Sequence, residues 1–192
     1  MKLLEDKILS CGTVLPGEIL KVDNFLNHQL DVELISALGE EFFRIFGNEN
    51  VTKILTVESS GIALAYAAAQ HFHVPVVFAK KGLHKNVGTD CYTAEVYSYT
   101  KGQSYIISVS RKYLSNSDRV LLIDDFLANG AAANGMIKIC GDAGAAVAGI
   151  GIAIEKGFQP GGQALRDRGF KLASLAIVDS MTDTSITFRP EA

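Results

Sequence analysis

Short runs of hydrophobic residues alternate along the chain with longer stretches in which apolar residues recur every three or four positions. Val120–Ile123 is a run of four aliphatic residues, which predicts a strand buried on both faces. Comparable runs predict further central strands over 51–57, 74–79 and 144–154. The periodic stretches 34–46 and 62–72 predict helices. Strands alternating with helices predict an α/β fold, with a parallel sheet flanked by helices and right-handed crossovers.

The rest of the pattern predicts shorter elements around this core. Residues 93–99 and 104–110 alternate between polar and apolar positions, which predicts an antiparallel hairpin. Asp31 is the expected N-cap of the helix that carries the 34–46 stripe. The loop 82–92 is polar and lacks periodicity, which predicts a mobile connection. Short helices are expected over 3–10 and 163–168, and final edge strands over 170–178 and 186–188.

Composition and charge narrow the class of protein. The 192 residues are 48% hydrophobic, which is enough for one domain with a sizeable core. A formal net charge of −3 gives no basic surface for nucleic acid. The N-terminal segment 1–7 carries acids and lacks a signal-peptide h-region, and no apolar run reaches the ~20 residues that span a bilayer. We therefore expect a cytoplasmic protein with neither a nucleic-acid nor a membrane partner.

Two adjacent carboxylates follow the central strand. Asp124 and Asp125 come after Val120–Ile123, and the next residues are small. Ligands of an open α/β sheet bind at the carboxyl ends of its strands, where a helix N-terminus offers unpaired N–H groups to a phosphate. Small residues let the backbone approach that phosphate; here they lie in the run Ala128, Asn129, Gly130, Ala131 and Ala132. Acids beside such a loop favour a ligand that is both phosphorylated and hydroxylated, or metal-bound.

Three more motifs stand at the ends of predicted strands. The tetrapeptide Glu58, Ser59, Ser60 and Gly61 precedes a helix, so it is a second candidate anion loop. Lys81 lies in a basic turn, and Lys156 and Phe158 follow the strand predicted to end at residue 154. Such lysines are usually only solvated. Because parallel strands end on one edge of the sheet, Lys156 could instead donate to a purine 6-oxo group, which would disfavour an amino group.

These motifs together resemble a known family. The run from Val120 to Ala132 is similar to the ribose-diphosphate signature of the type I phosphoribosyltransferases. The segments 20–29, 58–63, 123–130 and 154–161 resemble those of the bacterial xanthine phosphoribosyltransferases, and the resemblance covers essentially the whole chain. It implies one domain over 1–192, with a core of about 37–154 and 171–192. It also implies a flexible lid hairpin and an N-terminal hood of about 1–36 plus parts of 155–170.

The resemblance also implies substrates and roles. The reaction would transfer the phosphoribosyl group of 5-phosphoribosyl 1-diphosphate (PRPP) to N9 of xanthine, with Mg²⁺ bound alongside PRPP rather than in a dedicated protein metal site. Asp124, Asp125 and Lys81 would be catalytic. The runs 58–61 and 128–132 would bind PRPP. The xanthine site would comprise Leu20, Asn27, Lys156 and Phe158.

One departure from the family pattern and two alternatives remain. The family's usual Thr-Gly-Gly-Thr is replaced by Asn129-Gly130-Ala131-Ala132, so two phosphate-binding hydroxyls are missing. The Asn129 amide could replace one donor; without such replacement the sugar phosphate would be held more weakly. An enzyme for guanine or hypoxanthine would share every motif. A purine-responsive regulator on the same fold would need a DNA-binding domain for which this chain has no room. A homodimer is also implied, and the tyrosine-rich hairpin (Tyr92, Tyr97, Tyr99, Tyr105) could contribute its interface.

Overall fold

A mixed sheet forms the centre of the molecule. The computed structural model describes residues 1–82, 90–98, 102–182 and 185–190. Within them, eight strands pair in the order β10-β9-β8-β7-β3-β4-β6-β5. The five strands from β9 to β4 are parallel, as predicted, while β10 and the β5–β6 hairpin add antiparallel edges. The bounds are β3 Lys53–Val57, β4 Val76–Lys81, β5 Cys91–Ser98, β6 Gln103–Ser110, β7 Arg119–Leu127, β8 Ala146–Lys156, β9 Leu172–Thr182 and β10 Ser185–Phe188.

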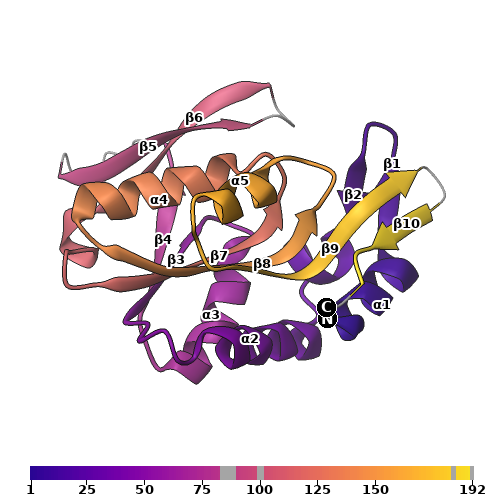
Figure 1. Ribbon diagram of the computed structural model, residues 1–192, viewed down its shortest axis with the longest axis horizontal. Coiled ribbons are helices and arrows are strands. Elements are labelled where there is room, and N and C mark those ends of the chain that lie inside the picture. The colour runs from indigo at the N-terminus through magenta and orange to yellow at the C-terminus, as the bar shows by residue number, and fades with distance from the viewer. Residues whose placement is uncertain (83–89, 99–101, 183–184, 191–192) are drawn as a thin grey trace.

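Helices cover both faces of this sheet (Figure 1). On one face lie α2 (Val32–Phe46) and α3 (Gly61–Phe72); on the other lie α4 (Ala131–Ala143) and α5 (Gly161–Asp167). The predicted N-cap is confirmed, because the Asp31 carboxylate accepts the Leu34 N–H at 3.1 Å. In the described part of the chain, no helix is long and apolar enough to cross a membrane.

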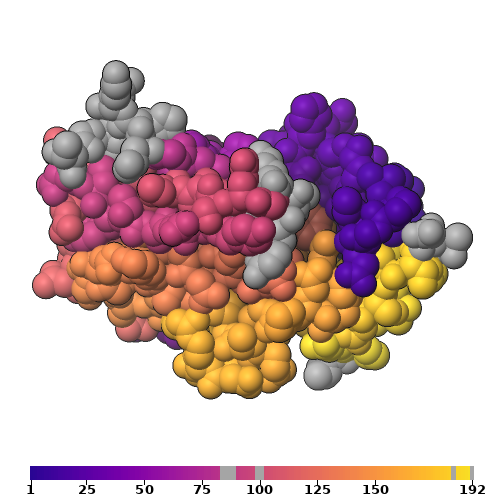
Figure 2. Space-filling model, turned by 90° about the horizontal axis from the view of Figure 1, so that it is seen from above, coloured from indigo at the N-terminus to yellow at the C-terminus, as the bar shows by residue number. Residues whose placement is uncertain are grey.

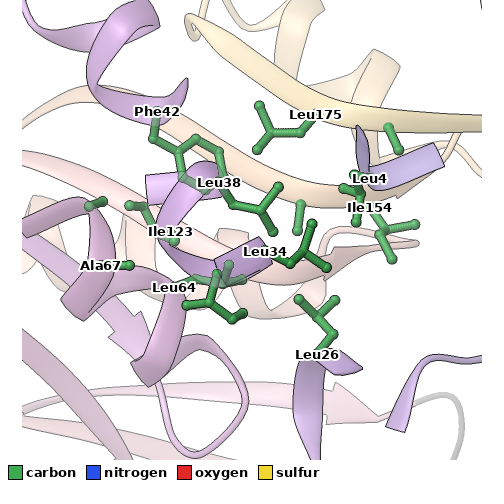
Figure 3. Close-up of a cluster of buried hydrophobic side chains, with 14 of the residues drawn as sticks. Leu4, Leu26, Leu34, Leu38, Phe42, Leu64, Ala67, Ile123, Ile154 and Leu175 are labelled. Atoms are coloured by element: carbon green, nitrogen blue, oxygen red, sulfur yellow. The ribbon is translucent and has the colours of Figure 1, made fainter. Parts of the chain in front are cut away.

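Strand β7 is buried on both faces, as its aliphatic run predicts. Leu121 and Ile123 point into the cluster formed with α2 and α3, whereas Val120 and Leu122 point into the cluster formed with α4. All four side chains are fully inaccessible to solvent. Figure 3 shows Ile123 among the side chains of α2 and α3. Two hydrophobic clusters therefore share one strand, which fixes the position of the residues at its carboxyl end.

The N-terminal segment packs beside the β9–β10 edge of the sheet. It consists of α1 (Lys2–Cys11), the antiparallel pair β1 (Thr13–Leu15) and β2 (Ile19–Lys21), and a π-helical turn over Asp23–Asn27. Figure 1 places these elements near β9 and β10, and Figure 2 shows them (indigo) and the β5–β6 hairpin (pink) on opposite sides of one face. Their buried side chains belong to the same cluster as α2 and α3.

Two expectations about the strands need revision, and one about a loop stays untested. Strand β8 runs to Lys156, two residues past the predicted end, because Glu155 and Lys156 still pair with β9. Strand β9 is not an edge strand, since β10 pairs with its other side. The predicted mobile loop lies largely outside the described residues, which resume at residue 90.

Candidate active site

The carboxyl ends of the parallel strands collect most of the chemically active residues at one edge of the sheet. Glu58 follows β3, Lys81 ends β4, Asp124 and Asp125 lie near the end of β7, and Lys156 ends β8. Because β3, β4, β7 and β8 are parallel neighbours, these side chains share one rim, as the sequence predicts.

The two aspartates are buried and close together. Asp124 is 7% exposed and Asp125 is 8% exposed, and the Asp125 N–H donates to the Asp124 carboxylate at 3.0 Å. The side-chain amide of Asn27 donates to Asp125 at 3.3 Å, which brings the N-terminal segment to the acids. Burial, together with the negative charge of Asp125, raises the pKa of Asp124 well above its usual value, and the charge of Lys81 opposes this shift. The pair therefore favours a ligand that supplies hydroxyl donors or positive charge.

The loop after β7 is shaped to present its backbone. Gly130 adopts a left-handed conformation (φ +80°) directly before the first residue of α4. Gly161, the first residue of α5, packs against this loop and donates its N–H to the Ala128 carbonyl at 3.1 Å. A Cβ at Gly161 would lie 2.3 Å from the Ala128 oxygen, so any larger residue would displace the loop. The arrangement leaves the N-terminus of α4 open to an anion.

The loop after β3 forms the second anion-binding candidate. The Glu58 carboxylate accepts the Lys81 N–H at 2.7 Å, which ties the ends of β3 and β4 together. At Gly61, the first residue of α3, a Cβ would lie 2.0 Å from the Thr56 hydroxyl and 3.3 Å from the Asp124 carboxylate. Glycine is therefore required there, and the loop lies directly beside the acids. The Glu58–Ser59 peptide is cis.

A cleft of about 450 Å³ lies between the loop 128–132 (the candidate phosphate loop), the turn between β1 and β2, and the β5–β6 hairpin. Lys156 lines it and donates from Nζ to the Glu18 carbonyl at 2.8 Å. Burial lowers the pKa of Lys156, while the charge of Glu18 raises it in part. The lining comprises Gly17–Ile19, Val96, Tyr97, Tyr105, residues 126–133, Lys156 and Gln159.

Three of the residues expected to contact the base, Leu20, Asn27 and Phe158, do not line this cleft. Leu20 is 7% exposed and belongs to the hydrophobic core, and Phe158 is half-buried and packs against the same core. The cleft instead contains Phe126 and Gln159, which sequence reasoning missed because nothing in their spacing marks them.

An ion pair with a buried carboxylate holds α5 in place beside the cleft. Glu155, 2% exposed, accepts two hydrogen bonds from the Arg166 guanidinium, each of 2.7 Å, and one from the Ser174 hydroxyl. Burial would raise the pKa of Glu155, but the bonds from Arg166 and Ser174 outweigh it and lower the pKa. The pair fixes α5, and with it Gly161, against the sheet.

The hairpin tyrosines that the structure describes differ in exposure. Tyr92 is 9% exposed, and Tyr105 faces the cleft. Tyr97 is 44% exposed, and Tyr99 lies outside the described residues. An interface formed by these tyrosines therefore stays a prediction, with Tyr97 as its most exposed described member.

Comparison with known proteins shows to which protein family the chain belongs. The phosphoribosyl transferase domain profile matches residues 21–163. The fold resembles adenine phosphoribosyltransferase from Rhodothermus marinus (TM-score 0.73, 20% identity, 93% of this chain and 100% of that one). It also resembles adenine phosphoribosyltransferase from Trypanosoma brucei (TM-score 0.72, 22% identity, 91% and 79%). The chain therefore belongs to the phosphoribosyltransferase family.

Relatives that match over nearly their whole length show to which group within the family the chain is most similar. The chain is 53% identical to the xanthine phosphoribosyltransferase of Ruminiclostridium cellulolyticum, over 98% of this chain and 99% of that one. It is 57% identical to the enzyme of the same name from Bifidobacterium animalis (94% of each) and 56% identical to that of Lactiplantibacillus plantarum (100% and 98%). Within the family, the chain groups with the xanthine phosphoribosyltransferases.

Proposed function

We propose that this enzyme transfers the 5-phosphoribosyl group of PRPP to N9 of xanthine, giving xanthosine 5′-monophosphate and diphosphate. The observation that carries the proposal is the position of Lys156, a cation lining the same cleft as the phosphate loop 128–132. A ligand in this cleft meets both the loop 128–132 and an ammonium donor, which suits a ribose phosphate joined to a 6-oxopurine. The names of the full-length relatives support the same substrate.

The anion loops divide the phosphates of the donor between them. Residues 128–132 hold the 5-phosphate at the N-terminus of α4, where unpaired N–H groups and the helix dipole favour negative charge. Residues 58–61 hold the diphosphate at the start of α3, next to Lys81. As N9 bonds to C1 of the ribose, the C1–O bond breaks and the diphosphate leaves with the bonding electrons. Lys81 stabilises the charge that develops on it.

Asp124 and Asp125 hold the ribose between the two loops. Their carboxylates accept hydrogen bonds from the 2- and 3-hydroxyls and offset the positive charge that develops on the sugar ring. They also suit a cation that arrives with PRPP, because they are adjacent, buried carboxylates at the rim. The described residues contain no cluster of three or more metal-binding side chains. Mg²⁺ bound with PRPP would neutralise the leaving diphosphate.

The base lies against Lys156. The ammonium donates to the 6-oxo group and stabilises the anionic form of the base, which makes N9 the better nucleophile. Adenine presents an amino group at the same position and leaves the lysine without an acceptor. Asn27, whose amide already contacts Asp125, is the candidate for the xanthine edge. Leu20 and Phe158, which do not line the cleft, remain proposed contacts of the base, and they would reach it once the hood closes over the site.

The flanking elements act as covers. The N-terminal segment is the hood over the base, and the β5–β6 hairpin belongs to the lid that excludes water from the oxocarbenium-like transition state. We also propose a homodimer, carried over from the family resemblance. Sedimentation as a monomer at working concentration would contradict it.

Turnover with four bases tests the proposed substrate. With saturating PRPP, kcat/KM should be highest for xanthine and lowest for adenine. A clear preference for adenine would overturn the role of Lys156, and a preference for guanine or hypoxanthine would favour that alternative. Absence of diphosphate release with every base would favour the purine-responsive regulator.

The variant Lys156→Met should lose at least about 100-fold in kcat/KM for xanthine while its affinity for PRPP stays close to wild type.

A further inference from the structure

The phosphate loop is short of side-chain donors. Asn129 is its only polar side chain, and Ala131 and Ala132 stand where the family pattern has a glycine and a threonine. A phosphate group carries about two negative charges and accepts several charge-assisted hydrogen bonds. Backbone N–H groups supply some of these bonds. A hydroxyl from another element would supply what the loop lacks.

One face of the β5–β6 hairpin lies on α4 beside this loop (Figure 1). A Cβ at Gly135 of α4 would lie 2.7 Å from Val96 and 3.0 Å from Ile107, so these two side chains pack directly on the helix. Tyr105 pairs with Val96 across the hairpin and stands two residues from Ile107. Side chains at paired and alternate positions share a face of a sheet, so Tyr105 points toward α4 as well.

The environment of Tyr105 is that of a substrate-facing group. Its side chain lines the cleft together with Ala131 and Ala132. The Lys81 ammonium lies 5.5 Å from the centre of its ring. Burial, with a smaller effect from the charge of Asp124, raises the pKa of the phenol, which therefore stays protonated at neutral pH. Within the described parts of the chain its hydroxyl makes no hydrogen bond, so the donor is available.

We propose that the Tyr105 hydroxyl donates a hydrogen bond to the 5-phosphate of PRPP and replaces a hydroxyl that the loop 128–132 lacks. The inference rests on the proposed function for the identity of the ligand. The 5-phosphate is favoured over the diphosphate because the cleft that Tyr105 lines contains the whole of 128–132 and none of 58–61.

The variant Tyr105→Phe tests the assignment, because it removes the hydroxyl and keeps the ring over Lys81. Calorimetric titration with ribose 5-phosphate and, separately, with inorganic diphosphate distinguishes the two phosphate sites. Affinity for ribose 5-phosphate should fall at least about tenfold, the usual effect of losing a hydrogen bond to a charged group, while affinity for diphosphate changes less than about twofold. In turnover, KM for PRPP should rise and KM for xanthine should not.

Two further variants complete the experiment. Tyr113→Phe removes a phenol that is 61% exposed and outside the cleft, and it should bind both probes like wild type. Ala132→Thr in the Tyr105→Phe background returns a hydroxyl to the loop and should recover most of the lost affinity for ribose 5-phosphate. Unchanged affinity of Tyr105→Phe for ribose 5-phosphate, or a loss confined to diphosphate, would overturn the proposal. Because both titrations are made without a base, a wrong assignment of xanthine would leave their outcome unaffected.

Discussion

At the scale of single residues, Asp124 is held in a position that costs stability. The carboxyl is buried beside Asp125, and both burial and that neighbour favour its protonated form. The folded protein therefore binds this proton more tightly than the unfolded chain, whose aspartate titrates near the usual value of 3.8. As pH rises from that value through the raised pKa, the free energy of unfolding falls, and above the raised pKa the loss is complete.

Asp124→Asn should consequently be more stable and less active. An amide of the same shape keeps the acceptor for the Asp125 N–H and removes the buried charge. Its melting temperature should exceed that of wild type, by more at about pH 8 than at about pH 5, while kcat falls at least about 100-fold. Thermal unfolding across this pH range checks the sign. A variant less stable than wild type at the upper end would contradict the assignment.

Gly161 is the residue whose replacement should disturb PRPP binding most without touching the ligand. In Gly161→Ala, the new Cβ meets the Ala128 carbonyl at 2.3 Å, so the phosphate loop has to move. KM for PRPP should rise by roughly 10- to 100-fold, as expected for a misplaced binding loop. Gly141→Ala is the matched control, because nothing lies within 4 Å of its Cβ in α4. It should leave KM unchanged and stabilise the protein by about 0.5–1 kcal/mol.

Some of these residues could be predicted from the sequence and others could not. Asp124, Lys81 and Lys156 could be placed on one rim in advance, because each stands at the end of a parallel strand. Gly161 and Tyr105 could not. Their importance comes from contacts with the loop 128–132 that depend on how α5 and the hairpin pack, and no local pattern encodes this. The only hint at Gly161 was its place in the Pro-Gly-Gly turn.

At the scale of elements, the short helix α5 depends on one buried ion pair. Seven residues form few helical hydrogen bonds, and Arg166 joins them to Glu155 of β8. The same pair explains why β8 runs further than predicted. A charged residue after an apolar run usually marks a strand end, whereas here Arg166 and Ser174 satisfy the carboxylate inside the protein. Alternation was sufficient to predict the hairpin, and apolar residues at every third or fourth position were sufficient to predict α2 and α3, because both signals are local.

Arg166→Met should therefore lower the stability of the folded protein. It leaves Glu155 buried without its counter-charge, and we expect a loss of about 3 kcal/mol in the free energy of unfolding, at the low end for such pairs because Arg166 is partly exposed. Chemical denaturation measures this. The double variant Glu155→Gln/Arg166→Met should lose less, because no isolated charge remains. The stability advantage of wild type over Arg166→Met should shrink as pH falls through the lowered pKa of Glu155, because the carboxylate becomes protonated and no longer pairs with the Arg166 cation. Equal losses in the single and double variants would contradict this account.

At the scale of the whole molecule, the alternating pattern was sufficient to predict the parallel core and its rim. It did not predict that β10 would cover β9 or that the N-terminal elements would join the α2–α3 cluster, because both depend on contacts between distant parts of the chain. The resemblance of the motifs supplied the idea of a hood. The structure adds the contacts, from Asn27 to Asp125 and from Lys156 to Glu18, that connect this segment to the carboxyl ends of β7 and β8.

The position of β7 in both hydrophobic clusters links occupancy of the site to the lifetime of the folded chain. A strand that carries the ligand-binding acids and anchors both halves of the interior cannot come apart locally while a substrate is bound. Saturation of such a site shifts the unfolding equilibrium by mass action, by about 2.7 kcal/mol when the free ligand is 100 times its Kd. We therefore expect a saturating concentration of PRPP to slow proteolysis of the polypeptide.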